Sequence, residues 1–302
     1  MESQFRALLE ATVLAASEVM PAEGRDLSEL LESRDGPAGL ITSQQTPRAS
    51  REDHLLFWLQ RNIDEGRVSF WVEQLKRLAA TQTDARMVLV TDPDYPECLR
   101  RSYDRPPFLF ERGEILSGDR RAVAIVGSRM ASKAAIKATI AVAEEAVRAR
   151  VTVVSGLASG VDSHAHRTAI ECDGRTIAVI GAGIDADPRL DGDHPLADAI
   201  VRAGALVSQF RPGSPPTRST FPARNAVISG LSVASLIMEA SERSGTRSEL
   251  DASIRQGRPV YFWLPAFHKA RWAELIVDSG SARFFESFED VKNDFMNADL
   301  PC

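Results

Sequence analysis

Cysteine is scarce in this sequence, and the spacing of the few that occur excludes two kinds of site. The chain has three cysteines among 302 residues. Cys98, Cys172 and Cys302 lie far apart and form no CxxC pair, so the spacing indicates neither a disulfide framework nor a thiolate zinc site. Such usage is typical of a protein of the reducing cytoplasm.

A long apolar run and a basic leader are also missing. The chain begins MESQFRALLEATVLAASEVM, in which acidic residues interrupt the apolar stretch on both sides. No basic segment precedes that stretch, as a secretory signal would require. We therefore expect neither a signal peptide nor a membrane span, and we expect a cytoplasmic location.

Positive charge is in deficit over the whole chain but not in one segment of it. The formal net charge is −6, which excludes a protein coated with basic surface. Between Val201 and Pro259, however, eight arginines occur against four acidic residues. Arginine suits bidentate contact with phosphate and stacking on bases. Any nucleic-acid or phosphate binding is therefore expected at a local site.

Composition and apolar periodicity predict an α/β fold in two parts. The chain is 44% hydrophobic and 26% charged, as in soluble globular proteins. Apolar residues at helical spacing, such as Leu55, Leu56 and Leu59 and a second set from Phe70 to Leu78, predict a small helical N-terminal region over residues 1–84. Over residues 85–302, short aliphatic runs alternate with Ala-rich segments. That pattern predicts a doubly wound, mostly parallel Rossmann-like sheet with helices on both faces.

The aliphatic runs and the segments between them give the expected elements of this sheet. The predicted strands are Ala122–Val126, Val151–Val154, Thr176–Ile180, Ala205–Val207, Ala234–Met238 and Pro259–Trp263. The predicted helices are Ala131–Arg148, Val161–Ile170, Pro195–Arg202, Ala223–Ser229, Arg247–Gln256 and Arg271–Val277. Ligands of such sheets bind beyond the carboxyl ends of the strands, so the turns after the strands are the candidate sites.

Glycine-containing turns follow several of the predicted strands. Each glycine either makes a simple strand-to-helix turn or lets the backbone approach a ligand closely. After the first strand, Arg129 adds a guanidinium, and the start of the next helix is expected to offer free N–H groups to an anion. The turn residues singled out here are Gly127, Ser128, Arg129, Gly156, Gly245 and Thr246.

Motifs for other functions are missing or incomplete. Gly181 and Gly183 match the start of the dinucleotide fingerprint GxGxxG, but no third glycine follows, so no NAD is expected. Asp162 and His166 share a helical face, yet two ligands are too few for a metal, and a helix-start carboxylate with a hydrogen-bonded histidine explains them better. No GxSxG elbow occurs. We expect no metal and no cofactor.

Several ordered stretches of the chain resemble a known family. They read DPDYPECLRR, VAIVGSR, VVSGLASGVDSHAHRTAI, TIAVIGAGID, GALVSQFRPGSPP, FPARNAVISGLS and QGRPVYFWLP. In order and spacing, over about residues 87 to 292, they resemble the DprA/Smf DNA-processing proteins. The resemblance implies a Rossmann-like protein, usually a homodimer, that is not an enzyme. It also implies that the protein binds and protects single-stranded DNA and hands it to a RecA-type recombinase in transformation or recombination.

The resemblance also implies a DNA pocket. In that pocket, arginines bind phosphates while an aromatic side chain contacts a base. For Arg224 and Asn225 the alternative is a buried hydrogen-bond network that holds the following helix, and for Phe221 it is core packing. The pocket residues implied here are Arg129, Arg218, Phe221, Arg224 and Asn225.

A second resemblance concerns the stretch SGTRSEL. Gly245, Thr246 and Glu249 are similar to part of the GGxGTxxE motif of the cytokinin-activating LOG phosphoribohydrolases. That similarity implies a phosphate held by the Gly-Thr pair and a Glu249 that assists cleavage of a glycosidic bond, or a nucleotide sensor without catalysis. The alternative is that Glu249 is only a favourable charge near a helix start.

Overall fold

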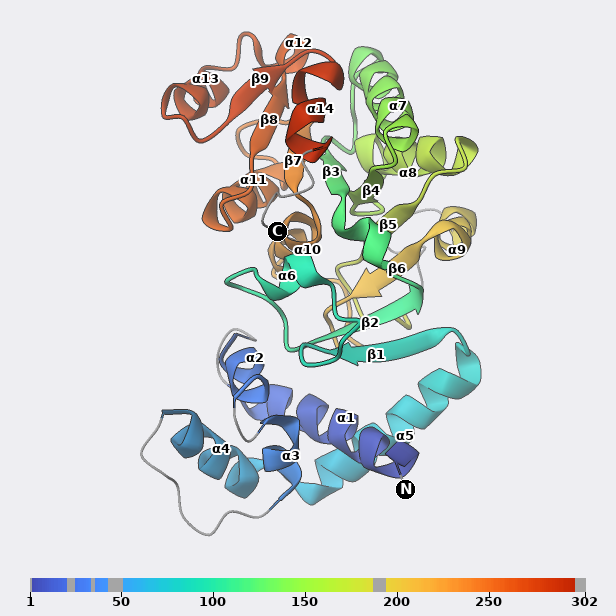
Figure 1. Ribbon diagram of the computed structural model, residues 1–302, viewed down its shortest axis with the longest axis vertical. Helices are drawn as coiled ribbons and strands as arrows, with labels where there is room; N and C mark the ends of the chain where they lie inside the picture. The colour runs from blue at the N-terminus through green and yellow to red at the C-terminus, as the bar shows by residue number, and fades with distance from the viewer. Residues whose placement is uncertain (1, 21–24, 34–35, 43–50, 187–193, 297–302) are drawn as a thin grey trace. The chain divides into compact units, whose positions relative to one another are not determined.

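The computed structural model describes residues 2–20, 25–33, 36–42, 51–186 and 194–296 (Figure 1). The chain forms two compact units. Unit 1 consists of Met1–Tyr95 and Tyr103–Phe110, and unit 2 consists of Pro96–Ser102 and Glu111–Cys302. The expected division into a helical region 1–84 and a Rossmann-like domain 85–302 stays a prediction. In the described part of the chain, no helix is both long and apolar enough to cross a bilayer.

Unit 1 is built mainly from helices. Its elements are α1 (Glu2–Val19), α2 (Arg25–Leu31), α3 (Gly36–Ile41), α4 (Arg51–Asn62), α5 (Glu65–Thr81), β1 (Ala85–Leu89) and the start of β2 (Phe108–Gly113), which pairs with β1. The Asp64 side chain begins α5 by accepting hydrogen bonds from the N–H groups of Gly66 and Arg67. Such a cap satisfies N–H groups that have no partner inside the helix.

The buried face of α5 differs from the one that the apolar spacing predicts. In α4, Leu56 and Leu59 are buried as expected. In α5, Trp71 and Leu78 are buried, whereas Phe70 is 40% exposed. The Arg67 guanidinium lies over the Phe70 ring at 4.2 Å from its centroid. This cation–π contact gives the exposed ring a partner on the helix surface.

Unit 2 contains a parallel sheet with helices on both faces (Figure 1). Its strands follow the order β6-β5-β4-β3-β7-β8-β9, and every described pair among them is parallel. The strands are β3 (Ala122–Val126), β4 (Thr152–Ser155), β5 (Thr176–Val179), β6 (Ala205–Ser208), β7 (Ala234–Ile237), β8 (Val260–Trp263) and β9 (Arg283–Phe285). The chain winds outward from β3 to β6 and then returns to place β7 beside β3. This reversal is the switch point at which such sheets bind ligands.

The helices of unit 2 cover the sheet in two layers. They are α6 (Glu97–Arg100), α7 (Lys133–Arg148), α8 (Val161–Glu171), α9 (His194–Ala203), α10 (Thr220–Leu231), α11 (Thr246–Arg255), α12 (Leu264–Phe267), α13 (Arg271–Asp278) and α14 (Glu289–Met296), with a 3-10 turn at Ser117–Arg120. On one face, α7 and α8 pack in a core with Val123, Ile125 and Leu236. On the other face, α10 packs against α11 and lies over β3, β4 and β5 (Figure 1).

The predicted α/β class and the doubly wound parallel sheet are confirmed. Each of the six predicted strands is present, and the bounds agree to within one residue at each end. The helix expected from Ala223 begins instead at Thr220. Pro222 does not prevent this, because a first-turn residue has no helical partner for its N–H. Cys172 is an exposed, free cysteine.

Gly160 joins the turn after β4 to the turn after β3. Its φ of 82° lies in the left-handed region that favours glycine. The N–H of the next residue, Val161, donates to the carbonyl of Ser128 at 3.2 Å. A Cβ at position 160 would lie 2.2 Å from that same carbonyl oxygen. Both the backbone conformation and the close approach of the two turns therefore require glycine here.

We predict that Gly160→Ala lowers the free energy of unfolding by about 1–3 kcal/mol, because a left-handed non-glycine residue is strained and must displace Ser128. Urea unfolding of both forms measures the difference. Gly118→Ala is the matched control, since its φ is not positive and its Cβ would meet no atom within 4 Å. Equal losses in the two variants would show that the turn is not constrained at Gly160.

Candidate nucleic-acid site

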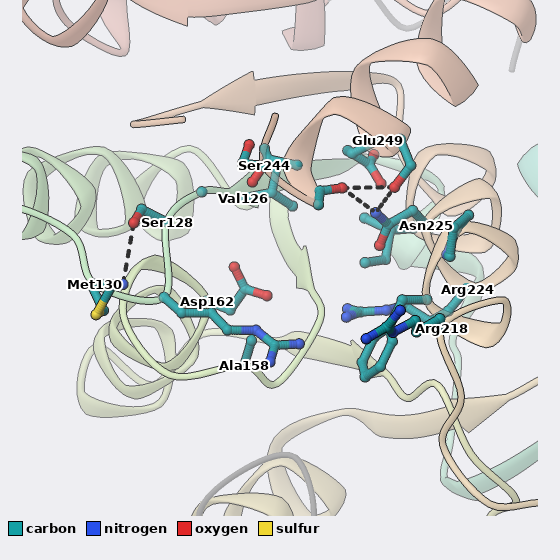
Figure 2. A pocket seen from close by; sticks show the side chains of 18 residues that line it. Val126, Ser128, Met130, Ala158, Asp162, Arg218, Arg224, Asn225, Ser244 and Glu249 are labelled. Carbon is teal, nitrogen blue, oxygen red and sulfur yellow. Dashed lines mark hydrogen bonds between the residues drawn. The ribbon is translucent and has the colours of Figure 1, made fainter. Parts of the chain in front are cut away.

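A cavity of about 530 Å³ lies beyond the ends of β3 and β7, at the switch point of the sheet (Figure 2). Its volume is in the range of pockets that hold small organic ligands. Of the residues singled out from the sequence, all except Gly156 line it, and their part in binding stays a prediction. The residues brought together here are Gly127, Ser128, Arg129, Arg218, Phe221, Arg224, Asn225, Gly245, Thr246 and Glu249.

Two arginines from different segments meet at one aromatic ring of this cavity. The guanidinium carbon of Arg129 lies 5.2 Å from the centroid of the Phe221 ring, and that of Arg224 lies 5.9 Å from it. Phe221 is only partly buried, so core packing does not account for the whole ring. A guanidinium near an aromatic face is held by a cation–π interaction. Arg218, which is exposed, adds a third positive charge to the cavity lining.

Arg224 is buried, in contrast to the other two arginines. It is 6% exposed and belongs to the second turn of α10. Its guanidinium lies against the backbone of Gly156, where a Cβ would come within 1.4 Å of Nη1. Gly156 therefore contributes to the site by leaving room for this guanidinium, although it is outside the cavity lining.

Asp162 stands opposite Arg224 and ties the turns after β3 and β4 together. Figure 2 shows the two side chains directed toward one another. The Asp162 carboxyl is buried, and backbone N–H groups of Gly127, Gly156 and Ala158 lie close enough to act on its pKa. Burial raises the pKa of Asp162, whereas Arg224 and these three N–H groups act to lower it. This role could not be predicted from the spacing of residues, because it depends on turns that are distant along the chain.

The metal interpretation of Asp162 and His166 finds no support in the geometry. His166 is buried, and its Nδ1 lies 2.7 Å from the hydroxyl of Thr176, not beside Asp162. Burial lowers the pKa of His166 to about 3, with Arg224 acting in the same direction, so the ring is neutral at pH 7. Among the described residues, no group of three His, Cys, Asp or Glu side chains is arranged to hold a metal ion.

The expected anion site at the start of α7 is already filled by the protein itself. The Ser132 side chain caps this helix by accepting a hydrogen bond from the N–H of Ala135 at 3.1 Å. The carboxylate of Glu239, just after β7, accepts from the N–H of Ser132 at 3.1 and 3.3 Å. Negative charge is favourable there because of the helix dipole. The turn of Gly127, Ser128 and Arg129 therefore offers its side chains rather than a free helix terminus.

Asn225 fits the hydrogen-bond network that was the alternative to DNA contact. Its Nδ2 donates to the hydroxyl of Ser248 at 2.7 Å and to the carbonyl of Gly245 at 3.3 Å (Figure 2). These bonds join α10 to the turn before α11. Asn225 therefore positions the Gly245 turn, and it holds the neighbouring helix rather than its own.

Glu249 forms the buried inner end of the cavity. It is 1% exposed, and its Oε1 accepts hydrogen bonds from the hydroxyls of Ser235 at 3.1 Å and Ser253 at 3.5 Å. Its Oε2 is buried and has no hydrogen-bond partner among the described residues. Burial raises the pKa of Glu249 to about 8 against the opposing effects of Ser235 and Arg224, so the carboxyl is mostly protonated at pH 7.

The fold and the cavity define an α/β protein with an arginine-lined cavity at the switch point of a parallel sheet. The chain belongs to the DNA recombination-mediator protein A family, whose model matches residues 86–296. A relative in Streptococcus pneumoniae is named a DNA processing protein. The resemblance stated from the sequence is therefore confirmed.

Individual relatives agree with this assignment. The DNA processing protein DprA of Streptococcus pneumoniae is 36% identical over 173 residues, which cover 57% of this chain and 60% of that protein. Its X-ray structure superimposes with a TM-score of 0.70 at 25% identity and covers 96% of both chains. DNA processing protein A of Helicobacter pylori was solved in a study of its single-stranded DNA binding mode. Its structure matches with a TM-score of 0.60 at 22% identity and covers 69% of this chain and 94% of that one. This match shows that the two proteins share a fold.

The buried Glu249 predicts a pH-dependent stability that a single substitution removes. Its pKa is raised from 4.5 to about 8, so its contribution is fully present below pH 4.5 and is lost as the pH rises through about 8. The pKa of His166 is lowered from 6.5, so its contribution to the free energy of unfolding is fully present above pH 6.5 and stays constant at higher pH. Between pH 6.5 and 8, the free energy of unfolding should fall by up to about 1.4 kcal/mol per pH unit more steeply in the wild type than in Glu249→Gln. Denaturant unfolding at several pH values measures both slopes, and parallel slopes would contradict the prediction.

Proposed function

We propose that this protein binds single-stranded DNA at the cavity between the ends of β3 and β7. The observation that carries the proposal is the convergence of Arg129 and Arg224 on the ring of Phe221, with Arg218 on the same lining. Arginines that neutralise phosphates beside an aromatic surface for a base are the elements of a single-strand site. The Helicobacter pylori relative, whose title describes single-stranded DNA binding, supports the same ligand.

The site fits a flexible strand better than a duplex. Its cations come from a turn, a loop and a helix interior around one small cavity, and a single strand can bend to bring a phosphate and a base to them in turn. A duplex is stiff and keeps its bases stacked. The net charge of −6 leaves little general attraction for DNA, so the affinity must come from this site.

The wider role of the protein follows from its family. We propose that it protects single-stranded DNA in the cytoplasm and, as a homodimer, delivers that strand to a RecA-type recombinase during transformation or recombination. Support for this role comes from the family description as a recombination mediator. The matched segment spans less than two thirds of the Streptococcus pneumoniae relative, so these partners are proposed rather than transferred.

Affinity for an oligonucleotide should favour the single strand over a blunt duplex of the same sequence, with little base preference. If three arginines each neutralise one phosphate, the logarithm of the binding constant should fall with the logarithm of salt concentration with a slope of about −2. Fluorescence anisotropy titrations at several salt concentrations measure both quantities. Equal affinity for the duplex would contradict the proposed site.

Replacing Arg129 or Arg224 with alanine should weaken single-strand binding roughly ten-fold to a hundred-fold, because each change removes one charge-assisted phosphate contact. Arg255→Ala is the matched control, since this exposed arginine ends α11 outside the cavity lining. Arg224 is buried and Arg129 is exposed, so only the loss of Arg224 is expected to lower stability. The thermal midpoint of each variant is therefore measured together with its affinity. If both variants bind as well as the control while only Arg224→Ala melts early, the arginines are architectural and the proposed site is wrong.

A further inference from the structure

The inner end of the cavity holds two polar atoms that the protein itself does not satisfy. The hydroxyl of Ser244 and the Oε2 of Glu249 are both buried and lack a hydrogen-bond partner among the described residues. Both residues line the cavity, and Figure 2 shows them on the same side of it, across from Ala158. Buried polar groups are usually paired, so two such atoms at one end of one cavity indicate a missing ligand.

The start of α11 lies at this same inner end. The helix has ten residues, its N-cap is Gly245, and no side chain caps it within the described part of the chain. The start of a helix is the positive end of its dipole and attracts anions. At α7 Ser132 and Glu239 occupy this position, whereas at α11 the N–H groups of Arg247 and Ser248 donate to the carbonyls of Ser244 and Gly245, at 3.0 and 3.2 Å, and no side chain adds a negative charge there in the described part of the chain.

The charges around the inner end favour an anion. The buried Arg224 approaches it from α10, and Arg129 and Arg218 lie on the same lining. Glu249 does not repel an anion at pH 7, because burial keeps its carboxyl mostly protonated and the proton makes it a donor. The serine hydroxyl, the protonated carboxyl and the guanidinium are all hydrogen-bond donors, and the dipole of α11 adds a partial positive charge. A phosphate group has acceptors for such a set.

We propose that the inner end of the cavity binds the terminal phosphate of a nucleoside 5′-monophosphate, either as a free nucleotide or as the phosphorylated 5′ end of a DNA strand. Glu249 bounds the cavity at this end and is only 1% exposed, so a strand cannot continue past it. A phosphate inside a strand has to continue on both sides, whereas a terminal phosphate does not. About 530 Å³ accommodates one nucleotide, with the Phe221 ring available to its base. For a strand end, this inference rests on the proposed function.

The test compares two oligonucleotides of one sequence that differ only in a 5′-phosphate or a 5′-hydroxyl group. Binding of the phosphorylated strand should be at least ten-fold tighter, and deoxyadenosine 5′-monophosphate should compete with it. Deoxyadenosine without phosphate is the control competitor. Equal affinity of the two strands, without competition by the nucleotide, would overturn this inference and leave single-strand binding at the cavity intact.

Two substitutions locate the phosphate. Ser244→Ala should remove most of the preference for the 5′-phosphate without changing the affinity for the 5′-hydroxyl strand. Ser241→Ala, an exposed serine of the same turn, is the matched control and should change neither. If Ser244→Ala retains the full preference, the phosphate lies elsewhere and the inference is wrong.

A pH series tests the donor role of Glu249. The groups that face it are the hydroxyls of Ser235 and Ser253, the Arg224 guanidinium and the Asp162 carboxylate, from β7, α11, α10 and α8. From pH 7 to pH 9 the wild type should lose the 5′-phosphate preference several-fold as Glu249 ionises, while Glu249→Gln, which keeps a neutral donor, retains it. The same loss in both proteins would refute the role of Glu249.

The outcomes separate this inference from the proposed function. If neither strand binds but deoxyadenosine 5′-monophosphate does, the proposed single-strand function fails and the inner site stands as a site for free nucleotides. If no strand and no nucleotide binds, both fail. If the phosphorylated strand binds tightly and the free nucleotide competes, both stand.

Discussion

The contact of the buried Asp162 carboxyl with the turns after β3 and β4 is the interaction on which the cavity depends. Backbone groups of Gly127, Gly156 and Ala158, from two turns that follow neighbouring strands, act with Arg224 to lower the pKa of Asp162. Burial acts in the opposite direction and is the larger effect, so these neighbours offset only part of the cost of a buried charge. The switch point of the sheet brings the two turns near one another, and Asp162 interacts with both.

The position of Arg224 follows from that arrangement. An isolated buried guanidinium is strongly unfavourable, but here Asp162 lies opposite it and Gly156 leaves the space for it. Once held, Arg224 presents its charge beside the Phe221 ring, where the exposed Arg129 arrives from the turn after β3. Electrostatic groups fixed in advance lose little freedom when a ligand binds. The buried pair is therefore better understood as a means of orienting Arg224 than as a source of stability.

The sequence predicted the sheet well because its strands are buried on both faces and are written as continuous aliphatic runs. β9 was missed because Arg283 is exposed and only Phe285 of its three residues is buried, so the strand gives no such run. Arg129 was predicted from its place in the turn after a strand, whereas Arg218, Phe221 and Arg224 were implied by the family resemblance. The roles of Asp162, Glu239 and Asn225 could not be predicted from spacing, since each acts on backbone or hydroxyl groups of a different element. Such contacts exist only once the elements are packed.

The two buried carboxyl groups of the cavity share one guanidinium, and burial raises the pKa of both. Arg224 acts to lower both pKa values, and the hydroxyls of Ser235 and Ser253 lower that of Glu249 by donating to one of its oxygens. Asp162 also raises the pKa of Glu249, because two negative charges near the same guanidinium repel one another. Any anion that enters the cavity acts in the same direction as Asp162, because its own charge opposes the ionisation of Glu249, so ligand binding and proton retention at Glu249 are coupled.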